Sequence, residues 1–256
     1  MNQILISEKL YVTPELKKKK KLFKIEFFLS VFLLCILSSY AIYAEYDRSK
    51  NEKISQEILQ GINYGLVNDK EEKNKEEEKA IVLILNKALE DNEEPKRTEP
   101  SPSQIANQAM QQQQRLQASD GSEYYAIGEI NIPSINVNYP ILCSDTLDNI
   151  DIILKISVCK FHGANPNEIG NLCIVGHNYK NSKFFSKVPT MENGDIIEIK
   201  DLSGRVLQYS VYDKFIVDPS DVSATTQLTG GKREITLITC TNDNERRYII
   251  KAREIK

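Results

Sequence analysis

Three side chains suited to nucleophilic catalysis stand at the ends of apolar, strand-like segments of this 256-residue chain. Cys240 ends the apolar and β-branched run Ile235–Cys240, and a polar loop follows it. His177 comes just after the apolar run Leu172–Val175, and Arg247 opens the last strand-like segment. A cysteine is nucleophilic as its thiolate, which needs a proton partner and positive charge nearby. The three positions are therefore a candidate nucleophile, proton carrier and cation.

A structural interpretation is open for the same residues. Free cysteine is among the most buried residue types, so position alone leaves a core role for Cys240 equally open. The chain has two histidines, and His162 lies in Lys160–Pro166, whose composition predicts a loop. His177 instead follows an apolar strand that can fix its position. This difference favours His177 over His162 as the partner of Cys240.

Strand parity distinguishes Arg247 from its neighbour Arg246, because successive side chains of a strand point to opposite faces. The core face of the last strand is predicted from three alternating apolar residues: Tyr248, Ile250 and Ala252. Arg247 falls on the other face with Lys251, where a cation stays solvated and can reach a substrate. Arg246 has core parity and escapes burial at the end of the strand. The same alternation places Cys240 off the core face of its own strand.

These segments resemble the sortases, membrane-anchored cysteine transpeptidases of Gram-positive bacteria. The matching elements are Thr236–Cys240 (the family's TLxTC), Gly176–Asn178, Arg247 with Ala252 five residues later, and Ile130–Val137 with Pro140–Ile141 (the family's IPxI entry). The resemblance extends from Tyr124 to Lys256, about half of the chain.

The resemblance implies a role for each site residue. Cys240 is expected to form a thioester with the substrate, and His177 to protonate the leaving amine and deprotonate the incoming one. Arg247 stays charged, so it is expected to donate hydrogen bonds to the oxyanion or to the peptide. Thr239 is expected to contact the substrate, with an ordinary strand position as the alternative.

The resemblance also implies the partners. The substrates are secreted proteins with an LPXTG-like C-terminal sorting signal, and the acceptor is an amino group of a peptidoglycan precursor or a pilin. We expect no cofactor and no metal, because no His/Cys cluster has zinc spacing. The net charge of −3 argues neither for nor against nucleic acid, and no nucleic-acid partner is expected.

Three alternatives stay open beside protein anchoring. The first is a cysteine peptidase whose acyl-enzyme is hydrolysed by water. The second is a non-catalytic, membrane-tethered β-domain that binds a wall ligand. The third, within the family, is a pilin polymerase; the chain shows neither the Asp-Pro-aromatic lid nor the second membrane segment expected of that subclass. The sorting motif, the acceptor, the subclass, calcium dependence and oligomeric state are left open.

A membrane anchor is predicted near the N-terminus. The consecutive lysines Lys17–Lys21 precede Phe27–Ala44, a stretch of eighteen residues without a charge. As a helix this stretch spans about 27 Å, close to the hydrocarbon thickness of a bilayer. The run is long for a cleaved signal peptide, which is the alternative. Because positive charge stays cytoplasmic, we expect a single-pass protein of the cell membrane with its catalytic domain outside.

The predicted domains follow from these segments: residues 1–21 form a basic cytoplasmic N-terminus, 22–44 the transmembrane anchor, 45–122 an extracellular stalk and linker, and 123–256 the catalytic domain. The stalk is expected to be helical and then disordered, since its composition turns to Pro, Ser and Gln after Glu93. The catalytic domain has many short strands with turn signals between them, which predicts an all-β barrel or sandwich. The resemblance selects the closed eight-stranded β-barrel, with a short helix within Thr146–Ile156.

The sequence predicts less about the roles of the other cysteines. Cys35 lies in the membrane segment, and Cys173 lies within an apolar strand, as a small core hydrophobe does. Cys143 and Cys159 would lie in an oxidising exterior, where a disulfide is permitted. Their spacing neither requires nor excludes a pair.

Overall fold

The computed structural model describes residues 14–87, 113–144 and 149–255. It divides into two compact units, Met1–Ser49 and Lys50–Lys256. Two sequence predictions fall partly outside the described residues: the start of the basic N-terminus (1–13) and most of the Pro/Ser/Gln-rich linker (93–112).

The first unit consists of the beginning of helix α1 (Pro14–Lys87). In the part of the chain that the structure describes, one helix is long and apolar enough to cross a membrane, and its candidate span lies within Lys17–Asn63. Large apolar side chains such as Phe28 and Phe32 are exposed along it. A bilayer would remove these side chains from water, which agrees with an anchor.

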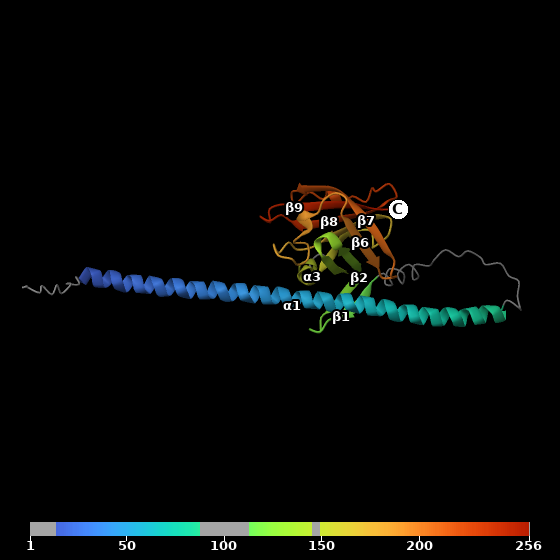
Figure 1. Cartoon of the computed structure of the whole chain (residues 1–256), viewed down its shortest axis with the longest axis horizontal. Coiled ribbons are helices and arrows are strands. Elements are labelled where there is room, and N and C mark those ends of the chain that lie inside the picture. The colour runs from blue at the N-terminus through green and yellow to red at the C-terminus, as the bar shows by residue number, and fades with distance from the viewer. Residues whose placement is uncertain (1–13, 88–112, 145–148, 256) are drawn as a thin grey trace, which may run out of the picture. The chain divides into compact units, whose positions relative to one another are not determined.

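The second unit contains a closed β-barrel (Figure 1). Its eight strands are β2 (Glu123–Ile132), β3 (Val137–Cys143), β4 (Val158–Gly163), β5 (Gly170–Val175), β6 (Ile196–Asp201), β7 (Val206–Val217), β8 (Arg233–Cys240) and β9 (Arg247–Glu254). The order around the barrel is β2-β3-β4-β5-β8-β9-β7-β6, and β6 pairs with β2 to close it. This confirms the predicted eight-stranded barrel.

Most neighbouring strands are antiparallel, but β3 pairs with β4 and β5 pairs with β8 in parallel. Parallel neighbours need a crossover connection. The short helix α3 (Ile150–Ile156) lies between β3 and β4, within the predicted segment. The described residues of the unit also form the 3-10 turns η1 (Pro133–Ile135), η3 (Val188–Thr190) and η4 (Ser223–Thr225). The β5–β8 pairing matters most for function, because it brings the ends of the two predicted catalytic strands to one edge.

Two segments that were predicted as stalk or linker pack against the barrel. Strand β1 (Gln114–Gln117) extends the sheet by pairing with the first half of β2. In the 54–62 part of α1, side chains at helical spacing are buried together with Tyr124 and Leu142 of the barrel. The apolar periodicity seen in the sequence therefore serves a packed interface in this part of the chain.

The predicted core parity is correct for β8 and for most of β9. Ile235, Leu237, Ile250 and Ala252 all belong to the barrel core. The prediction that Lys251 stays solvated is wrong, since its side chain is only 7% exposed. The outer face of β9 is covered there by the connection between β7 and β8, a long-range contact that strand parity does not contain.

The loop predicted around His162 is also wrong. His162 is an exposed residue of β4, and its Cα pairs with that of Cys173 on β5. Pairing with a neighbouring strand outweighs the polar and glycine-rich composition of the segment. Gly163 ends β4 with a φ of 87°, a conformation that glycine adopts without a steric penalty.

Candidate active site

The positions of Cys240 and His177 follow from the parallel pairing of β5 with β8. Val175 is the Cα partner of Ile238, and the backbone N–H of Gly176 donates to the carbonyl of Ile238 over 3.1 Å. His177 and Cys240 each come two residues after this pair. They therefore lie at the same level, just past or at the ends of two adjacent strands, at one end of the barrel.

Hydrogen bonds tie the residues on both sides of His177 to the end of β8. The Thr239 hydroxyl donates to the Gly176 carbonyl over 2.8 Å. The Asn178 amide donates to the Cys240 carbonyl over 3.0 Å and to Oδ1 of Asn242 over 3.2 Å. The backbone of His177 is thus held beside that of Cys240. Asn178 was not predicted as a site residue, and its place directly after His177 was the signal in the sequence that could have indicated it.

Aromatic side chains fix the loop that follows His177. The ring of Tyr179 lies 5.0 Å from the imidazole, and Phe184 packs edge-on against Tyr179 at 5.7 Å. A Cβ atom at Gly176 would lie 2.6 Å from the ring of Phe185, so a larger residue before His177 would displace that ring. The glycine of the Gly-His pair is therefore needed for packing.

Arg247 is the direct cross-strand neighbour of Cys240 in the β8–β9 ladder. Its side chain is half-buried, and Nη1 donates to the carbonyls of Arg246 and Asn244 over 3.1 and 3.4 Å. The neighbouring Arg246 is exposed, as predicted for a residue at the end of the strand. The guanidinium of Arg247 thus belongs to the edge of the barrel that carries Cys240 and His177.

A pocket of about 250 Å³ opens beside these residues. Its lining is mostly apolar: Phe161, Val175, Val217, Pro219, Asp221, Val222, Ala224, Thr225, Ile238, Arg247 and Ile249. Val175 and Ile238 precede His177 and Cys240 by two residues each, so the pocket continues from the candidate site along the outer face of the strands. An extended apolar peptide segment is the type of ligand that such a surface accepts.

The comparison with protein families identifies this domain. A family model described as the sortase domain matches residues 130–255. The chain contains a sortase domain. The match includes the ends of β5 and β8 and the start of β9, where His177, Cys240 and Arg247 lie.

Known sortases are similar over part of the chain. Sortase A of Bacillus anthracis is 29% identical over 158 residues, which cover 59% of this chain and 65% of that protein. The chain thus spans just under two thirds of the length of this curated relative. Among solved structures, the Clostridium perfringens sortase D5 transpeptidase shares 29% identity with a TM-score of 0.47, covering 61% of this chain and 90% of that one. Listeria monocytogenes sortase A shares 25% identity with a TM-score of 0.45, covering 51% and 88%.

The cysteines of the sortase domain differ in burial. Cys143, Cys159 and Cys173 are buried thiols, whereas the Cys240 thiol is half-buried, and none of the four is in a disulfide. Burial raises the pKa of the Cys159 thiol to about 12 and that of Cys173 to about 11. Both groups are therefore held as neutral thiols in the folded protein. Cys143 and Cys159 are not joined by a disulfide in this structure.

Thr239 is a buried residue near the end of β8. Its side chain is 1% exposed and its hydroxyl bonds the Gly176 carbonyl inside the protein. It shares the inward parity of Leu237, opposite to that of Cys240. The hydroxyl thus braces the segment that carries His177, as an ordinary strand position allows, and a contact between Thr239 and the substrate stays a prediction.

The surroundings of His177 change the pKa of its imidazole. Burial lowers its pKa from the ordinary value, the Asp151 carboxylate opposes this change, and the Lys155 ammonium reinforces it. Both charged residues belong to helix α3, so this helix tunes the proton affinity of His177. A lowered pKa leaves the imidazole neutral near neutral pH, ready to accept a proton.

This arrangement predicts opposite responses to two charge-removing variants. Lys155→Gln is expected to raise the pKa of His177, and Asp151→Asn is expected to lower it. Both residues are exposed, so added salt is expected to weaken both shifts. NMR titration of the imidazole Hε1 resonance in detergent-solubilised full chain measures them. Shifts of equal sign in the two variants would contradict the assigned electrostatics.

Proposed function

We propose that this protein is a membrane-anchored cysteine transpeptidase that cleaves a sorting signal and transfers the acyl part to an amine. The main observation in support is that Cys240, His177 and Arg247 lie at one end of the barrel, beside an apolar pocket. By resemblance to the family, the sorting signal is LPXTG-like and belongs to a secreted protein. The acceptor is an amino group of a peptidoglycan precursor or a pilin.

In the first half-reaction, the Cys240 sulfur attacks the scissile peptide carbonyl while His177 takes the thiol proton. The low pKa of His177 suits this step, because the neutral imidazole is the proton acceptor. The tetrahedral intermediate carries an oxyanion, to which the Arg247 guanidinium donates hydrogen bonds. The C–N bond then breaks, His177 gives its proton to the leaving amine, and a thioester remains on Cys240.

In the second half-reaction, an amine attacks the thioester and transfers a proton to His177. The C–S bond breaks, the new amide leaves, and the Cys240 thiolate regains the proton from His177. The bonds formed and broken balance without a cofactor. Water in place of the amine would make the same protein a peptidase, so the identity of the second nucleophile separates these two functions.

A candidate membrane span near the N-terminus supports the proposal. The lysines 17–21 precede the candidate span, which predicts a cytoplasmic N-terminus and an outer catalytic domain. A sortase domain held at the outer surface meets secreted substrates as they leave the membrane. Protease accessibility of the barrel in intact cells tests this orientation.

The decisive experiment uses the full chain in detergent micelles. It is incubated with a library of sorting-motif peptides, with and without amine acceptors, and the products are identified by mass spectrometry. An acyl–amine product supports transpeptidation, hydrolysis in the presence of every acceptor supports a peptidase, and binding without turnover supports a wall-binding domain. A motif cleaved in the library also defines the sorting signal.

The mechanism predicts unequal effects at the two neighbouring arginines. Arg247→Lys is expected to lower transfer by about 10²-fold, because an ammonium does not reproduce the forked donors of a guanidinium. Arg246→Lys, at an exposed side chain, is the matched control and is expected to stay within a few-fold of wild type. Steady-state transfer kinetics measure both variants, with circular dichroism as the test of folding. A crippled Arg246→Lys beside a normal Arg247→Lys would mean that the wrong arginine was chosen.

A further inference from the structure

The connection between β7 and β8, residues 218–232, forms one wall of the pocket. We call this connection the covering segment, because it lies over the outer face of β8 and β9. It contributes Pro219, Asp221, Val222, Ala224 and Thr225 to the lining. Hydrogen bonds within the segment shape its local turns, for example from the Thr225 N–H to the Val222 carbonyl. Its attachment to the strands beneath it places these turns over β8 and β9, and so decides the shape of the pocket.

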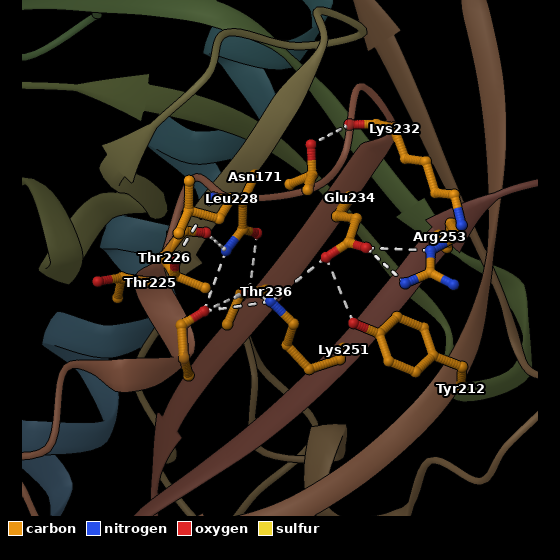
Figure 2. A network of polar contacts seen from close by, with 12 residues as sticks. Asn171, Tyr212, Thr225, Thr226, Leu228, Lys232, Glu234, Thr236, Lys251 and Arg253 are labelled. Carbon is orange, nitrogen blue, oxygen red and sulfur yellow. Dashed lines mark hydrogen bonds and ion pairs between the residues drawn. The ribbon is translucent and has the colours of Figure 1, made fainter.

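Lys251 of β9 is attached to this segment from below. Its Nζ donates to the Ala224 carbonyl over 3.2 Å and to the Thr236 hydroxyl over 2.9 Å, and it lies 3.7 Å from the Glu234 carboxylate. Figure 2 shows Lys251 reaching between Thr236 and Glu234, with Thr225 and Thr226 of the covering segment alongside. Of the three partners, only Ala224 belongs to the covering segment.

A buried ammonium at this place is costly unless it is fully partnered. Burial lowers the pKa of Lys251, and the Glu234 carboxylate opposes that change. Glu234 is also bonded by Arg253, over 2.6 and 3.0 Å, so Lys251 is not needed to neutralise it. The contacts of Lys251 that Arg253 does not duplicate are those with Thr236 and Ala224, and of these two residues Ala224 belongs to the covering segment.

A second attachment lies next to the first. The Asn171 amide donates to the carbonyls of Ala224 and Thr226 over 3.0 and 3.1 Å. The Gln227 side chain forms a reciprocal pair with the Asn171 backbone, accepting from its N–H over 3.0 Å and donating to its carbonyl over 2.9 Å. The Ala224 carbonyl is therefore the point at which β5 and β9 both hold the covering segment.

We propose that Lys251 is a positioning residue for substrate binding, which holds the covering segment in place through the Ala224 carbonyl. This inference rests on the proposed function for its substrate, a sorting-signal peptide, whose side chains would occupy the pocket. Lys251 lies away from the reacting atoms and is not catalytic. Its loss should therefore weaken peptide binding and leave the chemistry at Cys240 intact.

The test compares Lys251→Met with wild type in the full chain in detergent. KM for the best peptide is expected to rise about tenfold, the effect of losing one charge-assisted hydrogen bond, while kcat stays within twofold. Hydrogen exchange at residues 223–229 is expected to become faster. The rate of alkylation of Cys240 is expected to stay unchanged. A fall in kcat at constant KM, or unchanged exchange in the segment, would overturn the proposal.

The matched control is Arg253→Gln, which removes the other cation on Glu234 without touching the covering segment. It is expected to leave KM and the exchange of residues 223–229 as in wild type; an equal rise in KM would show that the effect arises from Glu234 alone and would overturn the proposal. Lys251→Gln keeps a donor for Ala224 and is expected to restore most of the lost affinity.

A double variant covers the case in which Lys251→Met does not fold. Lys251→Met with Glu234→Gln removes the buried ammonium together with its buried carboxylate, and the bond to Ala224 is still absent. The charge that loses its partner is the Arg253 guanidinium, which solvent reaches because its side chain is 42% exposed. The same rise in KM is expected, and an unchanged KM counts against the proposal. The exchange measurement needs no substrate. If wild type shows no turnover while Lys251→Met speeds exchange, the proposed function fails and the positioning role stands.

Discussion

Cys240→Ala is expected to abolish peptide cleavage and amine transfer together, with a loss of about 10³-fold or more. Both half-reactions of the proposed mechanism pass through the thioester on Cys240, so no step survives its removal. Cys240 ends β8 at the edge that also carries His177 and Arg247, and its side chain is partly accessible to solvent. Peptide cleavage and transfer are followed separately by mass spectrometry.

Cys173→Ala is the control for this variant. Cys173 is fully buried, and burial raises the pKa of its thiol to about 11, so it has neither access nor thiolate character. Its replacement is expected to cost about 1 kcal/mol of unfolding free energy and to leave turnover intact. A thiol reagent should label Cys240 before the other cysteines of the folded barrel. Equal chemical losses in Cys240→Ala and Cys173→Ala would refute the choice of nucleophile.

His177→Ala is expected to lower turnover by about 10²–10⁴-fold, the contribution typical of a general acid–base group. The imidazole carries the proton in both half-reactions, and its neighbours Gly176 and Asn178 are bonded to the end of β8. The acid side of the kcat/KM profile is expected to follow the lowered pKa of His177. Activity is therefore retained above that pKa and lost as the pH falls through it.

His162→Ala tests whether this loss is specific. His162 is an exposed residue of β4 that pairs with Cys173, two residues before Val175 on β5. Its replacement is expected to retain most of the turnover and the same acid limb of the pH profile. If His162→Ala were the inactive variant, the active-site geometry derived from the β5–β8 pairing would be wrong.

The long apolar helix, the barrel strands and the places of Cys240, His177 and Arg247 at strand ends were predictable from the sequence because each has a local signal. An uncharged stretch marks the span, and alternation of side chains assigns Ile235 and Leu237 to the core. The motif around Cys240 and the spacing to Arg247 identify the family without any coordinates. The alternation of side chains also distinguished Arg247 from Arg246, because consecutive residues of a strand point to opposite faces.

Interactions between distant segments were decided only by the tertiary structure. His162 was taken for a loop residue because its pairing partner on β5 is not a local feature of the chain. Thr239 was expected at the substrate, yet its hydroxyl has a buried acceptor, the Gly176 carbonyl, 63 positions away in the sequence. In both cases a backbone contact outweighs the local composition.

Lys251 shows the same limit most clearly. By itself the sequence determined that its side chain points away from the barrel core, since the β9 alternation fixes the direction. The sequence did not determine that this outer face is covered. Residues 218–232, which connect β7 to β8, fold back over β9, and this contact is not a local feature of β9. A lysine directed toward solvent by parity thus becomes a buried donor with three partners, since burial depends on what packs over a face as well as on the face itself.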